Sequence, residues 1–125
     1  MGGLATDSAG RLVIFHRGSR HWEIGSFNFN NRFNPKLGPI ADETLALVDT
    51  IDGSNRVVQQ WGSHLFYMPH GLTIDGRGRL WLTDVGAHQV GLVCLGIGCG
   101  LIEKLTCNMR IDCCTDEPRE PKEPN

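Results

Sequence analysis

Cysteine is absent from residues 1–93, and all five cysteines of the 125-residue chain lie between Cys94 and Cys114. Most of the chain therefore gives no indication of its redox compartment, and the odd count leaves one thiol unpaired within a monomer. An excess of basic residues is also missing, because the formal net charge is -2. This balance offers no electrostatic argument for a nucleic-acid partner.

Signals for export and for membrane insertion are equally scarce. Residues 1–7 (MGGLATD) lack the basic and apolar regions of a secretory signal peptide. The longest weakly polar run, residues 90–102, is too short and too rich in glycine to span a bilayer. No Asn-x-Ser/Thr sequon occurs, so we expect neither N-glycosylation nor a membrane span in this chain.

Glycine, by contrast, occupies 16 of 125 positions between short apolar runs, which favours a β-rich fold with many tight turns. The clearest pattern is an internal repeat. Residues 3–14 (GLATDSAGRLVI) and 71–82 (GLTIDGRGRLWL) align in constant register, since 71 − 3 = 68. Each copy predicts a β-hairpin with Asp and Gly in its turn. The identical pairs are Gly3/Gly71, Leu4/Leu72, Asp7/Asp75, Gly10/Gly78, Arg11/Arg79 and Leu12/Leu80.

Strand–turn–strand repeats are the units of β-propeller blades, which recur every ~40–50 residues. The longer offset indicates an insertion in the first blade, which we place at residues 19–38 because they show little periodicity. Residues 44–49 and 56–61 then form two outer strands around a turn at 52–55. The predicted fold is an all-β propeller with about one full blade and the start of a second. It is incomplete, because a propeller needs at least about four blades to close.

The repeat ends near residue 90, so we divide the chain into a partial propeller at residues 1–90 and a divergent segment at 91–125. The cysteine-rich part of that segment is open to three interpretations: a disulfide knot, a metal site, or sequence with no fold. The cysteine spacings fit no common zinc pattern. Residues 116–125 are charged and carry proline at every third position, which favours extended, solvated chain.

Two side chains are candidates for chemistry. His70 precedes the innermost strand of the second repeat, where its imidazole either reaches a metal on the propeller axis or is a half-buried polar group at the blade rim. Arg17 follows the second strand of the first repeat. It either binds a carboxylate through a two-pronged contact or is a solvated surface arginine.

Four collinear segments between residues 3 and 90 resemble the lyase domain of the peptidylglycine alpha-amidating enzymes. They are residues 12–18 (LVIFHRG), 37–40 (LGPI), 65–72 (LFYMPHGL) and 81–90 (WLTDVGAHQV). The first is similar to the family's motif around its active-site arginine, and the last two are similar to its second-blade segments. The resemblance implies a six-bladed propeller of NHL-type repeats, of which this chain is an amino-terminal fragment.

The resemblance also implies a reaction, the zinc-dependent cleavage of a peptidyl-alpha-hydroxyglycine into a peptide amide and glyoxylate. Zinc, held by three histidines, lowers the pKa of the substrate hydroxyl, and calcium on the axis supports the fold. His70 matches the first zinc histidine, and Arg17 matches the arginine that faces the substrate carboxylate. Leu4 and Leu72 match positions whose backbone carbonyls bind calcium.

By the same resemblance, the partners are hydroxylated peptides extended by a C-terminal glycine, together with a monooxygenase domain. The implied location is a secretory vesicle or the extracellular space, although the sequence shows no signal peptide. The family's other two zinc histidines, its catalytic tyrosine and its calcium-binding aspartate lie in later blades. Tyr67 and His88 stand at different positions and inherit no such role.

We therefore expect a truncated form of the lyase that is inactive by itself. The alternative hypothesis is a catalytically inactive fragment or splice product that acts as an NHL-type interaction module.

Overall fold

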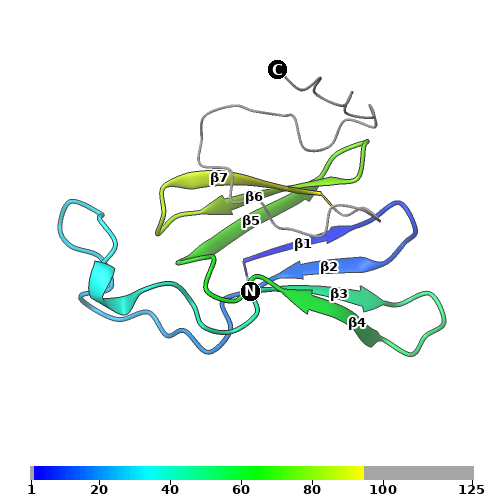
Figure 1. Ribbon diagram of the computed structural model, residues 1–125, viewed down its shortest axis with the longest axis horizontal. Coiled ribbons are helices and arrows are strands. Elements are labelled where there is room, and N and C mark those ends of the chain that lie inside the picture. The colour runs from blue at the N-terminus through cyan, green and yellow to red at the C-terminus, as the bar shows by residue number, and fades with distance from the viewer. Residues whose placement is uncertain (1, 95–125) are drawn as a thin grey trace, which may run out of the picture.

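The computed structural model describes residues 2–94, which form two antiparallel sheets and contain no α-helix. The first sheet has the order β1 (Gly3–Thr6), β2 (Leu12–Phe15), β3 (Leu45–Asp49) and β4 (Arg56–Trp61). The second has the order β5 (Pro69–Ile74), β6 (Arg79–Asp84) and β7 (Gln89–Cys94). Every strand pairs with its neighbour in sequence, so each sheet is a meander (Figure 1). The predictions of an all-β fold and of one four-stranded blade are confirmed.

The two predicted hairpins are equivalent down to the hydrogen bonds of their turns. The backbone nitrogen of Asp7 donates to the oxygen of Arg11 at 2.9 Å, and that of Asp75 donates to the oxygen of Arg79 at 3.0 Å. Each aspartate also accepts from the backbone nitrogen of its arginine, at 2.8 Å in the first turn and 3.1 Å in the second. Each forms an ion pair with the guanidinium as well. The repeat therefore reproduces one turn geometry twice.

The second turn has one contact that the first lacks. The indole nitrogen of Trp81 donates to Asp75 Oδ2 at 2.9 Å, whereas the equivalent position in the first repeat is Val13, which has no side-chain donor. This hydrogen bond, reinforced by those from Arg79, holds the pKa of Asp75 below its usual value. The carboxylate of this turn is therefore ionised at neutral pH.

The sheets meet along β1 and β5, which lie side by side in Figure 1. Gly3 lies so close to β5 that a Cβ atom there would be 2.6 Å from the backbone nitrogen of Leu72. Only glycine permits this approach. The core then forms from apolar side chains of both sheets, namely Val13, Phe15, Leu45, Leu47, Leu80, Leu82 and Val93.

The insertion at residues 19–38 contains, as regular structure, only the 3-10 helix η1 (Pro35–Leu37) and an isolated bridge between Phe27 and Phe33. At the other end of the described region, β7 pairs with β6 as far as Cys94, beyond the boundary that the sequence placed at residue 90. Residues 95–125, where the cysteine-rich and proline-rich segments were predicted, lie outside the described residues. Within residues 2–94, no helix is long and apolar enough to cross a membrane.

Candidate functional site

Arg17 lies far in the sequence from Pro69 and His70, but it contacts Pro69 where the two sheets join. Arg17 follows β2, and its Nε donates to the backbone oxygen of Pro69 at 2.9 Å. Pro69 is buried at the start of β5 and is followed directly by His70. Arg17 is half-buried and His70 is exposed. The structure therefore joins Arg17 by a hydrogen bond to Pro69, the residue that directly precedes His70.

A β-bulge sets the direction of His70. The register between β5 and β6 shifts between Pro69 and Gly71, so His70 has no direct partner on β6. The extra residue of a bulge bends its strand and re-aims its side chain, and bulges are common beside active sites. His70 is therefore displayed at the start of the edge strand with its imidazole exposed to solvent.

The turn after Arg17 is fixed by its own contacts. Gly18 has a φ of 56°, and a Cβ atom there would overlap the carboxylate of Asp42. Asp42 Oδ2 accepts from the backbone nitrogen of Ser19 at 2.7 Å and from its hydroxyl at 2.5 Å. These two hydrogen bonds lower the pKa of Asp42. The backbone oxygen of Arg17 also accepts from the nitrogen of Arg20 at 3.1 Å, which closes the turn.

The segment before His70 is held by a buried carboxylate. Asp84, only 6% exposed, accepts from the backbone nitrogens of Tyr67 at 2.7 Å, Met68 at 2.8 Å and Ala87 at 3.1 Å. Three backbone donors around one carboxylate fix the chain on both sides of β6. Asp84 thereby positions the residues that lead into His70.

An aromatic cluster fills the insertion and supports Arg17. The guanidinium carbon of Arg17 lies 5.5 Å from the ring centroid of Trp22. Trp22 packs against Phe27 and Phe33, with centroid distances of 6.0 and 6.2 Å. Phe33 in turn meets Tyr67 edge to face at 5.4 Å. The aromatic rings of the insertion thus pack between Arg17 and the segment before His70.

Leu4 and Leu72 occupy equivalent places on the edge strands β1 and β5. Asp7 and Asp75 each form a hydrogen-bonded pair across their hairpin, and each leucine stands three residues earlier in the same register. Hydrogen-bonded and non-hydrogen-bonded pairs alternate in an antiparallel ladder, so both leucines fall on non-hydrogen-bonded pairs. Their carbonyl oxygens point out of the hairpins, and oxygens of this kind suit Ca²⁺.

The described residues fit a zinc ion less well. All five histidines of the chain fall within residues 2–94, yet in this part no three His, Cys, Asp or Glu side chains gather as a metal-binding group. Catalytic zinc sites normally take three protein ligands. His70 therefore supplies one imidazole, and this region does not complete a zinc site by itself.

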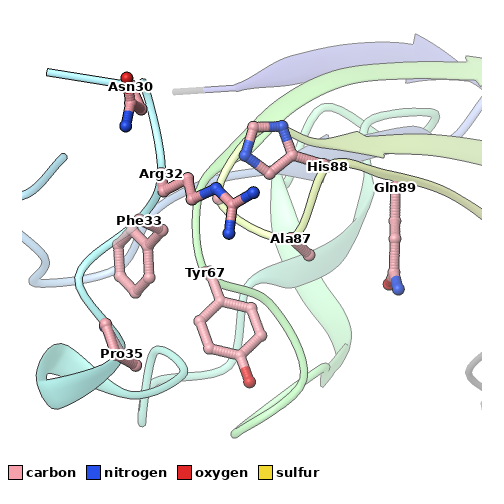
Figure 2. A pocket seen from close by; sticks show the side chains of 9 residues that line it. Asn30, Arg32, Phe33, Pro35, Tyr67, Ala87, His88 and Gln89 are labelled. Carbon is pink, nitrogen blue, oxygen red and sulfur yellow. The ribbon is translucent and has the colours of Figure 1, made fainter. Parts of the chain in front are cut away.

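A cavity of about 680 Å³ lies between the insertion and the turn that joins β6 to β7. Figure 2 shows Phe33 and Tyr67 on one wall, with the Arg32 side chain extended toward His88. His88 is exposed in this turn at a φ of 52°. Tyr67 and His88 thus line a cavity of mixed polar and apolar character.

Sequence reasoning missed the roles of Asp84 and Trp22. The repeat offset could have drawn attention to Asp84, because it pairs this residue with His16 (84 − 16 = 68). Both side chains accept a backbone N–H from the turn that follows, His16 Nδ1 from Gly18 at 3.1 Å and Asp84 from Ala87 at 3.1 Å. No such signal existed for Trp22, which lies in an insertion without periodicity.

Comparison with known proteins agrees with this geometry. Residues 66–91, which include most of the second sheet, match the NHL repeat. Over 88 residues, or 70% of its length, the chain is 48% identical to a probable peptidyl-alpha-hydroxyglycine alpha-amidating lyase of Caenorhabditis elegans. It is 44% identical over 87 residues, or 69% of its length, to peptidyl-alpha-hydroxyglycine alpha-amidating lyase 2 of Drosophila melanogaster. It is also 44% identical over 89 residues, again 70% of its length, to the peptidylglycine alpha-amidating monooxygenase of Rattus norvegicus.

The aligned part covers 24%, 21% and 9% of these relatives, respectively. The chain therefore spans about a quarter or less of the curated relatives that it matches. The identity is nevertheless high and extends through most of the chain. The chain belongs to the family of the peptidyl-alpha-hydroxyglycine alpha-amidating lyases, and the similarity covers some 70% of its length.

Proposed function

We propose that this chain contributes Arg17 and His70 to a site that splits a peptidyl-alpha-hydroxyglycine into a peptide amide and glyoxylate. The observation that carries the proposal is the hydrogen bond from Arg17 Nε to the backbone oxygen of Pro69, at 2.9 Å. It holds the Arg17 guanidinium against Pro69, and the next residue, His70, is exposed at a bulge. The names of the relatives give this pair its chemical context.

Arg17 suits the recognition of the substrate carboxylate. Its Nε is engaged with Pro69, while Nη1 and Nη2 have no hydrogen bond or ion pair within residues 2–94. Two parallel N–H groups of this kind match the two oxygens of a carboxylate. The carboxylate of the hydroxyglycine would dock here, with its α-carbon turned toward His70.

His70 would be one ligand of a zinc ion, which when bound lowers the pKa of a hydroxyl group. The exposed imidazole is accessible for this role. The carbonyl oxygens of Leu4 and Leu72 would be two ligands of a calcium ion at the edge where β1 meets β5. Calcium takes 6–8 oxygens, so these two carbonyls would not complete its site. Zinc would need further protein ligands, because no three His, Cys, Asp or Glu side chains gather within residues 2–94.

We infer that the chain by itself neither binds zinc tightly nor releases glyoxylate. A single imidazole leaves a zinc ion mostly hydrated, and attraction of the carboxylate by Arg17 does not by itself accelerate bond cleavage. The natural substrates would be hydroxylated peptides extended by a C-terminal glycine, supplied by a monooxygenase. A location in the secretory pathway follows from that role.

A chimera tests the proposed function. The aligned segment of the Drosophila lyase would be replaced by the corresponding residues of this chain, and glyoxylate release from a peptidyl-alpha-hydroxyglycine would be measured with added zinc. We expect turnover by the chimera and none by the chain alone. The control is His88→Ala in the chimera, because His88 is also exposed but lies outside the proposed site. A folded chimera without activity would favour the interaction-module hypothesis instead.

A further inference from the structure

Trp22 is the one aromatic side chain within residues 2–94 whose ring faces the Arg17 guanidinium, at 5.5 Å. We propose that Trp22 is a positioning residue for Arg17, holding the guanidinium in the orientation that binds a carboxylate. The positioning of Arg17 by Trp22 is inferred from the geometry of the two side chains. Its consequence for the substrate rests on the function proposed above.

A guanidinium on a long side chain needs more than one contact to be fixed. A free arginine side chain has many rotamers, and fixing it in one of them costs conformational entropy. The hydrogen bond to Pro69 fixes the Nε edge of Arg17, and the indole of Trp22 restrains the plane. Neither contact uses Nη1 or Nη2. The two contacts together therefore orient the side chain and leave its outer donors available.

Trp22 is itself immobilised by the insertion. Its ring packs against Phe27 at 6.0 Å and Phe33 at 6.2 Å, and these two phenylalanines meet each other at 5.6 Å. The bridge between Phe27 and Phe33 fixes their backbones. Arg20 ties the start of the insertion to its end through a hydrogen bond to the backbone oxygen of Gly38 at 2.9 Å. The ring under Arg17 is thus part of a closed structural unit.

The indole nitrogen of Trp22 indicates that packing alone does not explain this residue. Nε1 is buried and has no hydrogen-bond partner within residues 2–94. An unsatisfied buried donor is destabilising, and phenylalanine at this position would avoid that cost. Tryptophan, however, is the strongest cation–π partner. The two roles therefore predict different outcomes when Trp22 is replaced by phenylalanine.

The test measures the mobility of Arg17 directly, without any enzymatic activity. In the ¹⁵N-labelled full chain, the Nε–H signal of Arg17 is assigned by its loss in Arg17→Lys, and its order parameter is measured by relaxation. We expect a value near that of rigid backbone, about 0.85, in the wild type and below about 0.6 in Trp22→Leu. Trp61→Phe is the matched control, because Trp61 packs against the core of the sheets.

Trp22→Phe keeps the test decisive if Trp22→Leu does not fold. This variant should unfold at the same temperature as the wild type or higher, since the unsatisfied donor is gone, while the Nε–H group of Arg17 becomes more mobile. An unchanged order parameter in folded Trp22→Leu, or in Trp22→Phe where only that variant folds, would overturn the proposal.

A titration separates this proposal from the proposed function. An N-acyl-alpha-hydroxyglycine is added to the chain while the Arg17 signal is followed. A cation–π contact worth about 0.5–1 kcal/mol predicts affinity about two- to fivefold weaker in Trp22→Leu, which removes the ring. In one outcome, the wild-type Arg17 signal stays unchanged on addition of the ligand while its order parameter falls in the Trp22 variants. That result would support the positioning role and contradict carboxylate binding by Arg17.

Discussion

Replacing Asp84 with asparagine should loosen the segment that leads into His70. The carboxylate is 6% exposed and accepts three backbone N–H groups. Oδ1 accepts from the backbone nitrogens of Met68 at 2.8 Å and Ala87 at 3.1 Å, and Oδ2 accepts from that of Tyr67 at 2.7 Å. In asparagine, one oxygen can keep the first two bonds, but the amide NH₂ group then faces the N–H of Tyr67.

The expected loss of stability follows from the amide NH₂ group that faces the N–H of Tyr67. Asp84→Asn removes one charge-assisted hydrogen bond and sets an amide NH₂ group against the N–H of Tyr67, which costs about 2 kcal/mol. For a domain of this size, that corresponds to a drop of roughly 8 to 16 °C in melting temperature. Asp84→Ala loses all three bonds and should cost about 3–5 kcal/mol. The damage should concentrate before β5, because Tyr67 and Met68 depend on this carboxylate.

Urea denaturation measures the free energy of unfolding, and hydrogen exchange of the Tyr67 and Met68 amides locates the change. Asp49→Asn is the control, because Asp49 accepts only one backbone bond, from Ile51 at 3.0 Å in an exposed turn. It should cost less than about 0.5 kcal/mol. If Asp84→Asn were equally mild, or if the two amides kept their protection, Asp84 would not hold this segment.

Three further outcomes are expected. Gly18→Ala should cost more than about 1 kcal/mol in urea denaturation, because of the φ of 56° and the overlap with Asp42, whereas a neutral result would contradict the turn geometry. Gly3→Ala should separate β1 from β5 and raise amide exchange in both strands. Asp75→Asn should cost stability at pH 7 but progressively less at lower pH. The reason is that the lowered pKa, due first to Trp81, confers stability above the ordinary Asp value of about 3.9 that is lost as pH falls through the folded-state pKa. A pH-independent loss would contradict that account.

Much of the fold could be predicted from the sequence because repeated hairpins encode their turns locally. The aspartate and glycine positions of residues 3–14 and 71–82 fixed both turns, and the turn at residues 52–55 located β4 as observed, at Arg56–Trp61. The end of β7 was harder, because Gly91 interrupts its apolar pattern. Its pairing with β6 is a tertiary contact that composition does not reveal.

The candidate site could be predicted in part. The sequence located Arg17 and His70 through motifs, but it gave no distance between them. The hydrogen bond to Pro69 and the bulge at His70 depend on how two hairpins pack, which is a property of the assembled sheets. The contact of Trp22 with Arg17 could not be predicted from a local sequence pattern for the same reason. It comes from an irregular insertion that folds back on itself.

A double-mutant cycle in the active chimera tests most directly whether Arg17 and His70 act in one site. Glyoxylate release would be measured for Arg17→Ala, His70→Ala and the double variant. Residues that act as a unit are strongly non-additive, so we predict that the double variant loses little more kcat/KM than the worse single variant. Losses that simply add on a free-energy scale, or single variants with unchanged kcat/KM, would contradict the claim that these two residues form one lyase site.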